Sequence, residues 1–68
     1  MSIIVNGKRH ELPRPQSLEV FLRALNLPSM EQGIAVAVNG EIVRKPEWPG
    51  RFIKPGDEVE IVQAAQGG

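Results

Sequence analysis

Residues 34–43 read IAVAVNGEIV and carry the strongest fold signal in the chain. Large and small apolar side chains alternate over residues 34–38, a pattern typical of a central β-strand with one crowded face. Asn39 and Gly40 follow, and this pair favours a two-residue type I′ turn because both of its positions take positive φ. The segment therefore predicts a β-hairpin whose first strand lies inside a sheet. Its expected core residues are the large side chains of that strand: Ile34, Val36 and Val38.

The same turn signal occurs near the start of the chain. A short β-branched run at residues 2–5 meets Asn6-Gly7, and residues 8–12 can return as a second strand. Period-two alternation places Ile4 on the face opposite the core, where an apolar side chain is either incidental or part of a contact surface. The residues of this first strand that are expected to face inward are Met1, Ile3 and Val5.

Residues 18–25 have the spacing of an amphipathic helix. Ser17 suits the N-cap, and Asn26 with the proline two residues later offers a stop. A helix of about nine residues is unstable alone in water, so its apolar stripe must be buried on a sheet. The stripe consists of Leu18, Phe21, Leu22 and Leu25. Residues 30–33 are interpreted as the connection to the next strand.

Residues 44–50 contain two prolines and the only tryptophan of the sequence. This composition predicts an irregular loop that crosses the domain. Trp48 has two interpretations: an anchor for a partner, or a side chain that seals the edge of the protein's own core. In a domain with few aromatic residues the core interpretation is the more frequent one, so we expect Trp48 to be buried.

The last strand is predicted at residues 58–62, where apolar and acidic side chains alternate. It follows Pro55-Gly56, which fits the two central positions of a type II turn. The alternation places Val59 and Ile61 toward the core and Val62 outward.

Taken together, these segments predict a small α+β domain with the order ββαβββ. The first and last strands can pair in parallel at the centre of a mixed sheet because long connections separate them. One main helix would cover one face of the sheet and leave the other face open. We expect a folded domain over residues 1–62 and a flexible tail over residues 63–68. The apolar residues expected on the open face are Ile4, Ala35, Ala37 and Val62.

Length and charge exclude several functional classes. A chain of 68 residues forms one domain with a thin core, so a deep catalytic cleft is not expected. Eight basic and eight acidic side chains cancel, which removes the net positive field that drives non-specific nucleic-acid binding. We therefore expect no nucleic-acid partner.

Cysteine usage and hydropathy bear on the location of the protein. The sequence has no cysteine, so it contains neither a disulfide framework nor a thiolate metal site. It shows neither a charged leader nor an apolar run of membrane-spanning length. We expect a cytoplasmic, soluble protein that does not bind membranes and is monomeric when free.

Candidates for chemistry within the domain are few. His10 is the only histidine and has no cysteine or second histidine to complete a metal site, so a solvated surface position is expected. The only hydroxyl nucleophile candidates are three serines: Ser2, Ser17 and Ser29. We therefore expect no catalytic residue, no metal site and no bound cofactor.

The C-terminal residues Gly67 and Gly68 suggest where chemistry occurs. Glycines lack Cβ, so their backbone can enter a channel too narrow for side chains, and the α-carboxylate of Gly68 is then the only reactive group. From Gln63 to Gly68 an extended tail reaches roughly 20 Å, far enough to enter a neighbouring active site. The alternative is an ordinary frayed chain end.

The whole chain resembles the bacterial thiamin-biosynthesis sulfur carrier proteins, the ThiS family. Three segments carry the resemblance: IIVNG at residues 3–7, AVNGEIVR at residues 37–44 with Trp48 four residues on, and PGDEVEI at residues 55–61 before the terminal Gly-Gly. Members of this family are small ubiquitin-like β-grasp proteins, and the middle segment is the most specific of the three. The resemblance implies a β-grasp fold for this chain.

The resemblance also implies a mechanism and a set of partners. An E1-like adenylyltransferase would use ATP to adenylate the Gly68 carboxylate, and sulfur relayed from a cysteine desulfurase would convert it to a thiocarboxylate. Thiazole synthase would then take the sulfur into the thiazole ring of thiamin. Gly67 and Gln66 would belong to the inserted tail. The expected partner-binding face comprises Ile4, Val62 and Ala64.

Two other functions remain open from the sequence. One is the small subunit of molybdopterin synthase, which uses the same fold and tail to deliver sulfur to a pterin. The other is a small β-grasp or S4-like binding module, because such domains share the Pro-Gly-Asp-x-Val turn into a strand. Balanced charge and the glycine tail argue against the second.

Overall fold

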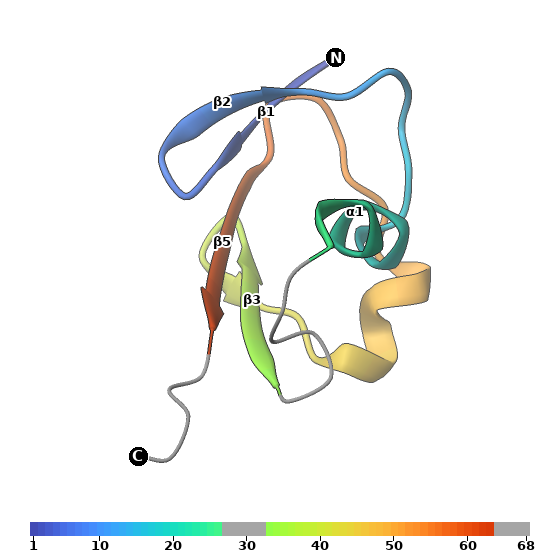
Figure 1. The fold of residues 1–68 in the computed structure, drawn as a ribbon, viewed down its shortest axis with the longest axis vertical. Helices are drawn as coiled ribbons and strands as arrows, with labels where there is room; N and C mark the ends of the chain where they lie inside the picture. Colours follow the sequence, from blue (N-terminus) through green and yellow to red (C-terminus); the bar gives the residue numbers. More distant parts are fainter. Residues whose placement is uncertain (27–32, 64–68) are drawn as a thin grey trace.

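The structure, a computed structural model, describes residues 1–26 and 33–63 of the chain. Its elements, in order, are β1 (Ser2–Val5), β2 (Lys8–Glu11), α1 (Leu18–Leu25), β3 (Ile34–Val38), β4 (Glu41–Ile42), the 3₁₀ helix η1 (Lys45–Gly50) and β5 (Glu58–Gln63) (Figure 1). The strands form one five-stranded sheet in the order β2-β1-β5-β3-β4. Helix α1 lies against one face of this sheet, as the sequence predicts.

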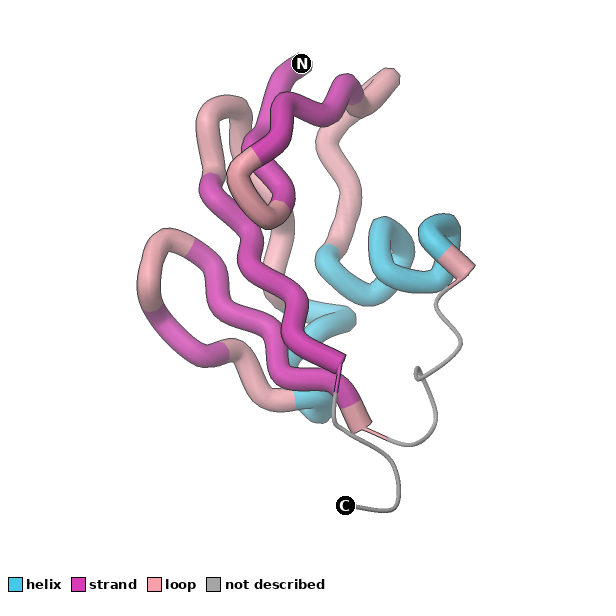
Figure 2. The backbone as a smooth tube through the Cα atoms, turned by 60° about the vertical axis from the view of Figure 1, so that its left-hand side comes forward, coloured by secondary structure: helices cyan, strands magenta, loops and turns pink. Residues whose placement is uncertain are grey.

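The central strand β5 pairs in parallel with its neighbour β1, although the two strands lie at opposite ends of the sequence (Figure 2). Ile4 is opposite Glu58 and Val5 is opposite Val59. The other strand pairs are antiparallel. This mixed sheet with one main helix is the β-grasp arrangement, which confirms the predicted fold class. Strand β5 extends one residue beyond its predicted end and includes Gln63.

Both predicted Asn-Gly turns are present. Asn6 and Gly7 have φ values of 50° and 83°, and Asn39 and Gly40 have φ values of 52° and 85°. Type I′ turns require positive φ at both central positions, and asparagine and glycine adopt it at the lowest steric cost. The local sequence therefore specifies both hairpins.

Helix α1 begins and ends where its capping residues predict. The hydroxyl oxygen of Ser17 accepts a hydrogen bond of 3.1 Å from the backbone N–H of Val20, which satisfies one of the free donors of the first turn. Asn26 adopts the left-handed conformation at φ 56° and ends the helix. The connection predicted at residues 30–33 lies outside the described residues except for Gly33.

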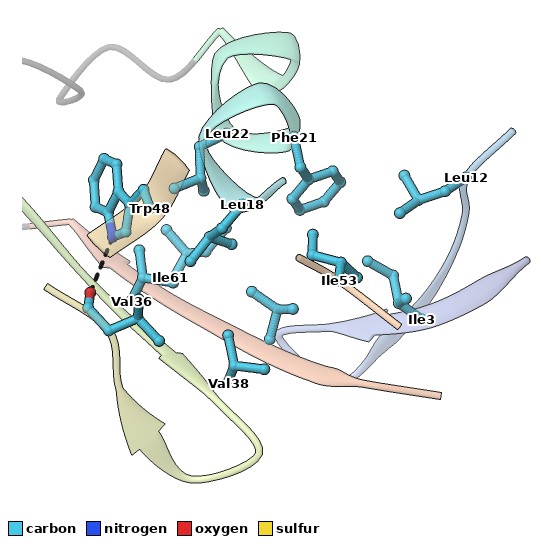
Figure 3. Close-up of a cluster of buried hydrophobic side chains, with 12 residues drawn as sticks. Ile3, Leu12, Leu18, Phe21, Leu22, Val36, Val38, Trp48, Ile53 and Ile61 are labelled. Carbon is cyan, nitrogen blue, oxygen red and sulfur yellow. Dashed lines mark hydrogen bonds between the residues drawn. The ribbon is translucent and has the colours of Figure 1, made fainter. Parts of the chain in front are cut away.

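The core lies between α1 and the sheet (Figure 3). Its buried apolar residues are Ile3, Leu12, Leu18, Phe21, Leu22, Val36, Val38, Val43, Trp48, Ile53, Val59 and Ile61. Four partly buried residues pack against it: Met1, Val5, Leu25 and Ile34. This set contains the inward residues predicted for the first, third and last strands and the whole apolar stripe of the helix. The predicted side-chain orientations are therefore confirmed.

Trp48 belongs to this core. Its side chain is only 2% exposed, and its indole nitrogen donates a hydrogen bond of 2.9 Å to the backbone oxygen of Val43 (Figure 3). A buried indole N–H needs such a partner. The core interpretation of Trp48 is confirmed.

The prediction of an irregular loop over residues 44–50 is wrong, because Lys45–Gly50 forms the 3₁₀ helix η1. Two local features explain its formation. Pro46 lies in the first turn, where its missing N–H removes no hydrogen bond. The Glu47 side chain accepts a hydrogen bond of 3.3 Å from the backbone N–H of Arg44, and the N–H of Glu47 donates to the oxygen of Arg44 at 2.8 Å. The helix also carries Trp48 into the core.

Candidate functional site

The face of the sheet opposite α1, called the open face below, carries the side chains that alternate with the core residues. Along β5, Val59 and Ile61 are buried, whereas Val62 is 63% exposed. Residues directly opposite each other on paired strands project to the same face, so the pairing of Val62 with Ala35 places both on the open face. The pairing of Ala37 with Ile42 places these two residues beside them.

Two of the predicted partner-binding residues lie on this open face, but they are not adjacent. Ile4 is half-buried in β1 and lies opposite Glu58 at the start of β5. Val62 lies four residues further along β5, or about 13 Å away along the strand. The third predicted residue, Ala64, is outside the described residues, as are the tail residues Gln66, Gly67 and Gly68.

Ile42 is a surface residue that the sequence reasoning missed. It is 73% exposed, more than any other large apolar side chain in the described chain. The signal was present, because the Asn39-Gly40 turn pairs Ile42 with Ala37, and Ala37 was already expected to face outward. The residues Ala35, Ala37, Ile42 and Val62 are called the apolar patch below. The patch covers the open face near the end of β5 from which the tail continues.

Acidic side chains border the apolar patch. Glu58 and Glu60 alternate with the core residues of β5, so both project to the open face, and Glu60 lies opposite Ala37. Both are exposed, and neither forms an ion pair with any part of the described chain. The patch and its border therefore present apolar area beside unpaired negative charge.

The patch continues beyond β4 into a shallow groove between β4 and η1. Its lining includes Ile42, Pro46 and Arg51 together with the acidic residues Glu41 and Glu47. The groove is open to solvent.

A polar cluster occupies the other end of the open face, at the hairpin of β1 and β2. The hydroxyl of Ser2 and the guanidinium of Arg9 both donate to Oε2 of Glu11, the latter at 3.2 Å. These two hydrogen bonds, first from Ser2 and then from Arg9, lower the pKa of Glu11. Ser2 is a candidate nucleophile in the sequence, but in the structure its hydroxyl donates a hydrogen bond to the carboxylate of Glu11. Its role here is to hold the hairpin.

The other described candidates for chemistry, Ser17 and His10, make contacts that stabilise the fold. Ser17 caps α1, and Ser29 is outside the described residues. The prediction that His10 is a solvated surface residue is wrong, because its side chain is half-buried. Its ring meets the ring of Phe21 edge to face, with centroids 5.4 Å apart. The sequence alone did not show that the short strand β2 lies within reach of α1.

Within residues 1–26 and 33–63, no group of three or more His, Cys, Asp or Glu side chains is arranged to hold a metal ion. The described helices include none with the length and hydropathy needed to span a membrane.

Comparison with known proteins bears on the resemblance seen in the sequence. The model of the ThiS family matches residues 3–68. The sulfur carrier protein ThiS of Escherichia coli (strain K12) is 26% identical over 68 residues, covering 100% of both chains.

Two solved structures of a Geobacter metallireducens protein have the same fold. The crystal structure of this thiamine biosynthesis protein (ThiS) has a TM-score of 0.86 and 27% identity, with 100% of both chains covered. Its solution NMR structure has a TM-score of 0.81 and 27% identity and covers 100% of this chain and 88% of that one. The resemblance seen in the sequence is confirmed by the family model, which spans nearly the whole chain: the protein belongs to the ThiS family.

Proposed function

We propose that this protein is a sulfur carrier for thiamin biosynthesis and that its Gly68 carboxylate is the group that carries sulfur. The main support is the match of the family model over residues 3–68, which includes both terminal glycines. The relative from Escherichia coli is named a sulfur carrier protein. In this role the protein is a co-substrate of partner enzymes and is not itself a catalyst.

The chemistry at Gly68 requires activation. The carboxylate is ionised at neutral pH and is a poor electrophile. A partner adenylyltransferase joins a carboxylate oxygen to the α-phosphorus of ATP and releases pyrophosphate. The resulting acyl-adenylate has AMP as its leaving group, so the carbonyl carbon becomes open to attack.

A sulfur nucleophile then replaces AMP. When hydrosulfide attacks the carbonyl carbon, the C–O bond to AMP breaks and a thiocarboxylate forms without net oxidation or reduction. When the sulfur comes as a persulfide from a cysteine desulfurase relay, a thiol must afterwards cleave the S–S bond of the acyl disulfide. The thiocarboxylate delivers its sulfur to thiazole synthase. ATP and free thiols are cytoplasmic reagents, so we place the carrier in the cytoplasm.

The open face is the proposed docking surface for these partners. Val62 of the apolar patch is followed by Gln63, the last described residue, so a partner that binds the patch also lies close to the start of the tail. From there the extended tail reaches roughly 20 Å. In this model Ile4 and Ala64 add contacts outside the patch, and Gln66 and Gly67 occupy the channel that leads to the active site.

The charge of the open face suggests the chemistry of the partner surface. Glu58 and Glu60 border the patch without ion pairs in the described chain. A partner with apolar residues opposite the patch and basic side chains opposite these carboxylates matches it. Such complementary charge raises the association rate and selects the correct partner.

The test is intact-mass analysis of the protein after incubation with ATP, hydrosulfide and a ThiS-family adenylyltransferase. We expect the replacement of one oxygen by one sulfur, and fragmentation should place the change at Gly68. A reaction without ATP is the control and should leave the mass unchanged. The positive control is the adenylyltransferase with its own carrier protein, which it should modify. If that control works and this protein stays unmodified, the proposal is contradicted.

A further inference from the structure

Strand β5, which leads into the tail, has unequal support along its two edges. On one edge β3 pairs with it from Ile34 opposite Gln63 to Val38 opposite Val59. On the other edge β1 pairs with it only as far as Val5 opposite Val59. The backbone of β1 therefore stops four residues before β5 ends.

The side chain of Asn6 extends the pairing on this shorter edge. Its backbone N–H donates to the oxygen of Val59 at 2.9 Å. Beyond it, Oδ1 of Asn6 accepts a hydrogen bond from the N–H of Ile61 at 2.8 Å, and Nδ2 donates to the oxygen of Ile61 at 3.2 Å. A carboxamide offers the same donor and acceptor as a peptide group. Asn6 thus takes the place of one further residue of β1 while the chain turns away at Gly7.

Asn39 makes a comparable clamp at the opposite end of β5. Its Oδ1 accepts from the N–H of Glu58 at 2.9 Å, and its Nδ2 donates to Oδ1 of Asp57 at 3.0 Å. Both asparagines occupy the first position of an Asn-Gly turn, are exposed and have nearly equal φ values of 50° and 52°. They differ in location: Asn39 holds the start of β5, and Asn6 holds the end that leads to the tail.

We propose that Asn6 is a positioning residue that fixes the point from which the tail departs. This inference rests on the proposed reaction at Gly68. If Ile61 lost these two hydrogen bonds, the end of β5 would keep its pairing with β3 but lose this support on the edge next to β1. Its last residues could then detach from the sheet, which would lengthen the tether to Gly68. A longer tether lowers the effective concentration of its end and its alignment with a partner's active site.

The competing explanation is that Asn6 serves only the turn. Glycine adopts φ near 50° as readily as asparagine, so Asn6→Gly should then be harmless. Asn39→Gly is the matched control, because it also removes two side-chain hydrogen bonds to β5 or its entry turn while it keeps the turn geometry. Asn6→Asp tests for rescue, since aspartate tolerates positive φ and retains the acceptor for Ile61.

A local measurement shows whether the end of β5 loosens. Backbone amides alternate between the two edges of a strand, so the N–H of Val62 faces β3 and does not contact Asn6. In Asn6→Gly we expect faster hydrogen exchange of the Val62 amide, and in Asn39→Gly the exchange rate at Val62 should stay close to that of the wild type. Unchanged exchange at Val62 in Asn6→Gly would overturn the inference.

The functional measurement is pyrophosphate exchange with a ThiS-family adenylyltransferase, at a temperature where each variant is folded by circular dichroism. We expect kcat/KM of Asn6→Gly to fall about threefold to tenfold further than that of Asn39→Gly, with Asn6→Asp in between. Equal values for the two glycine variants would overturn the positioning role alone. If the wild type itself fails to support exchange, the proposed function fails, and the role of Asn6 fails with it. If Asn6→Gly does not fold, kcat/KM of Asn6→Asp is compared with that of Asn39→Gly instead, and the positioning role requires the lower value for Asn6→Asp.

Discussion

The indole nitrogen of Trp48 lies 2.9 Å from the backbone oxygen of Val43 and donates a hydrogen bond to it inside the core. This bond joins the 3₁₀ helix η1 to the residue that directly follows β4. The only tryptophan of the chain lies in the proline-rich segment that forms η1, and η1 directs its side chain inward. There Trp48 belongs to the same buried cluster as Leu22 of α1 (Figure 3).

Replacement of this tryptophan should affect stability and leave tail chemistry intact. Trp48→Phe keeps an aromatic ring but leaves the buried oxygen of Val43 without its donor, which costs about 1–3 kcal/mol in the free energy of unfolding. Urea unfolding measures this loss. An unchanged free energy of unfolding, together with weaker binding to an adenylyltransferase, would instead make Trp48 a partner anchor.

Truncation of the helix stripe should have a larger effect. Leu22 is fully buried in α1, so Leu22→Ala leaves a cavity and should cost on the order of 2–5 kcal/mol in the free energy of unfolding. Val20 on the same helix is 54% exposed, and Val20→Ala should change stability by no more than about 0.5 kcal/mol. Thermal unfolding of the two variants checks the helix orientation. Similar midpoints for both would show that the stripe is assigned to the wrong side.

Charge in the apolar patch should weaken partner binding without unfolding the protein. Val62→Glu and Ile42→Glu place a carboxylate in the proposed interface, where loss of an anchor costs above about 1 kcal/mol in binding. Their stability should stay within about 0.5 kcal/mol of the wild type, because both side chains face solvent. Val20→Glu, on the exposed side of α1, is the matched control and should bind normally. Titration calorimetry with an adenylyltransferase gives the affinities, and wild-type affinity in both patch variants would remove the open face from the model.

Acid should weaken the hairpin of β1 and β2 through Glu11. Hydrogen bonds from Ser2 and Arg9 lower the pKa of Glu11 below its ordinary value of 4.5 in the folded protein. The stabilising contribution is therefore present above that ordinary pKa and is lost as the pH falls through the lowered one. Since Glu11 is exposed, the effect on stability is small, and NMR titration of its side-chain carboxyl is the suitable measurement. Ser2→Ala should raise the pKa of Glu11, and an unchanged titration curve would contradict the assignment of the cause.

Much of the fold follows from short-range signals in the sequence. Both hairpins follow from Asn-Gly pairs, and the helix boundaries follow from Ser17 and Asn26, because the physical causes lie within a few residues of each other. The parallel pairing of β1 with β5 could be inferred from chain connectivity. The outward position of Ile42 was also within reach, since the Asn39-Gly40 turn sets its register.

Other features depend on contacts between distant residues. The bonds from Asn6 to Ile61 join positions 55 residues apart, and no local pattern predicts them. The edge-to-face contact of His10 with Phe21 depends on how α1 crosses the sheet. The 3₁₀ helix η1 was missed because its prolines indicate a loop, whereas burial of Trp48 and the Glu47 cap favour a tight helical turn.

The central claim is that the Gly68 carboxylate is the reacting group, and pyrophosphate exchange with a ThiS-family adenylyltransferase tests it most directly. One alanine added after Gly68 leaves every described residue unchanged but moves the carboxylate by roughly 3.5 Å. That displacement equals the distance of about 3–3.5 Å required between reacting atoms. We predict that the wild type supports exchange and that the alanine-extended protein, folded by circular dichroism, does not. Exchange at the wild-type rate by the extended protein would contradict the account.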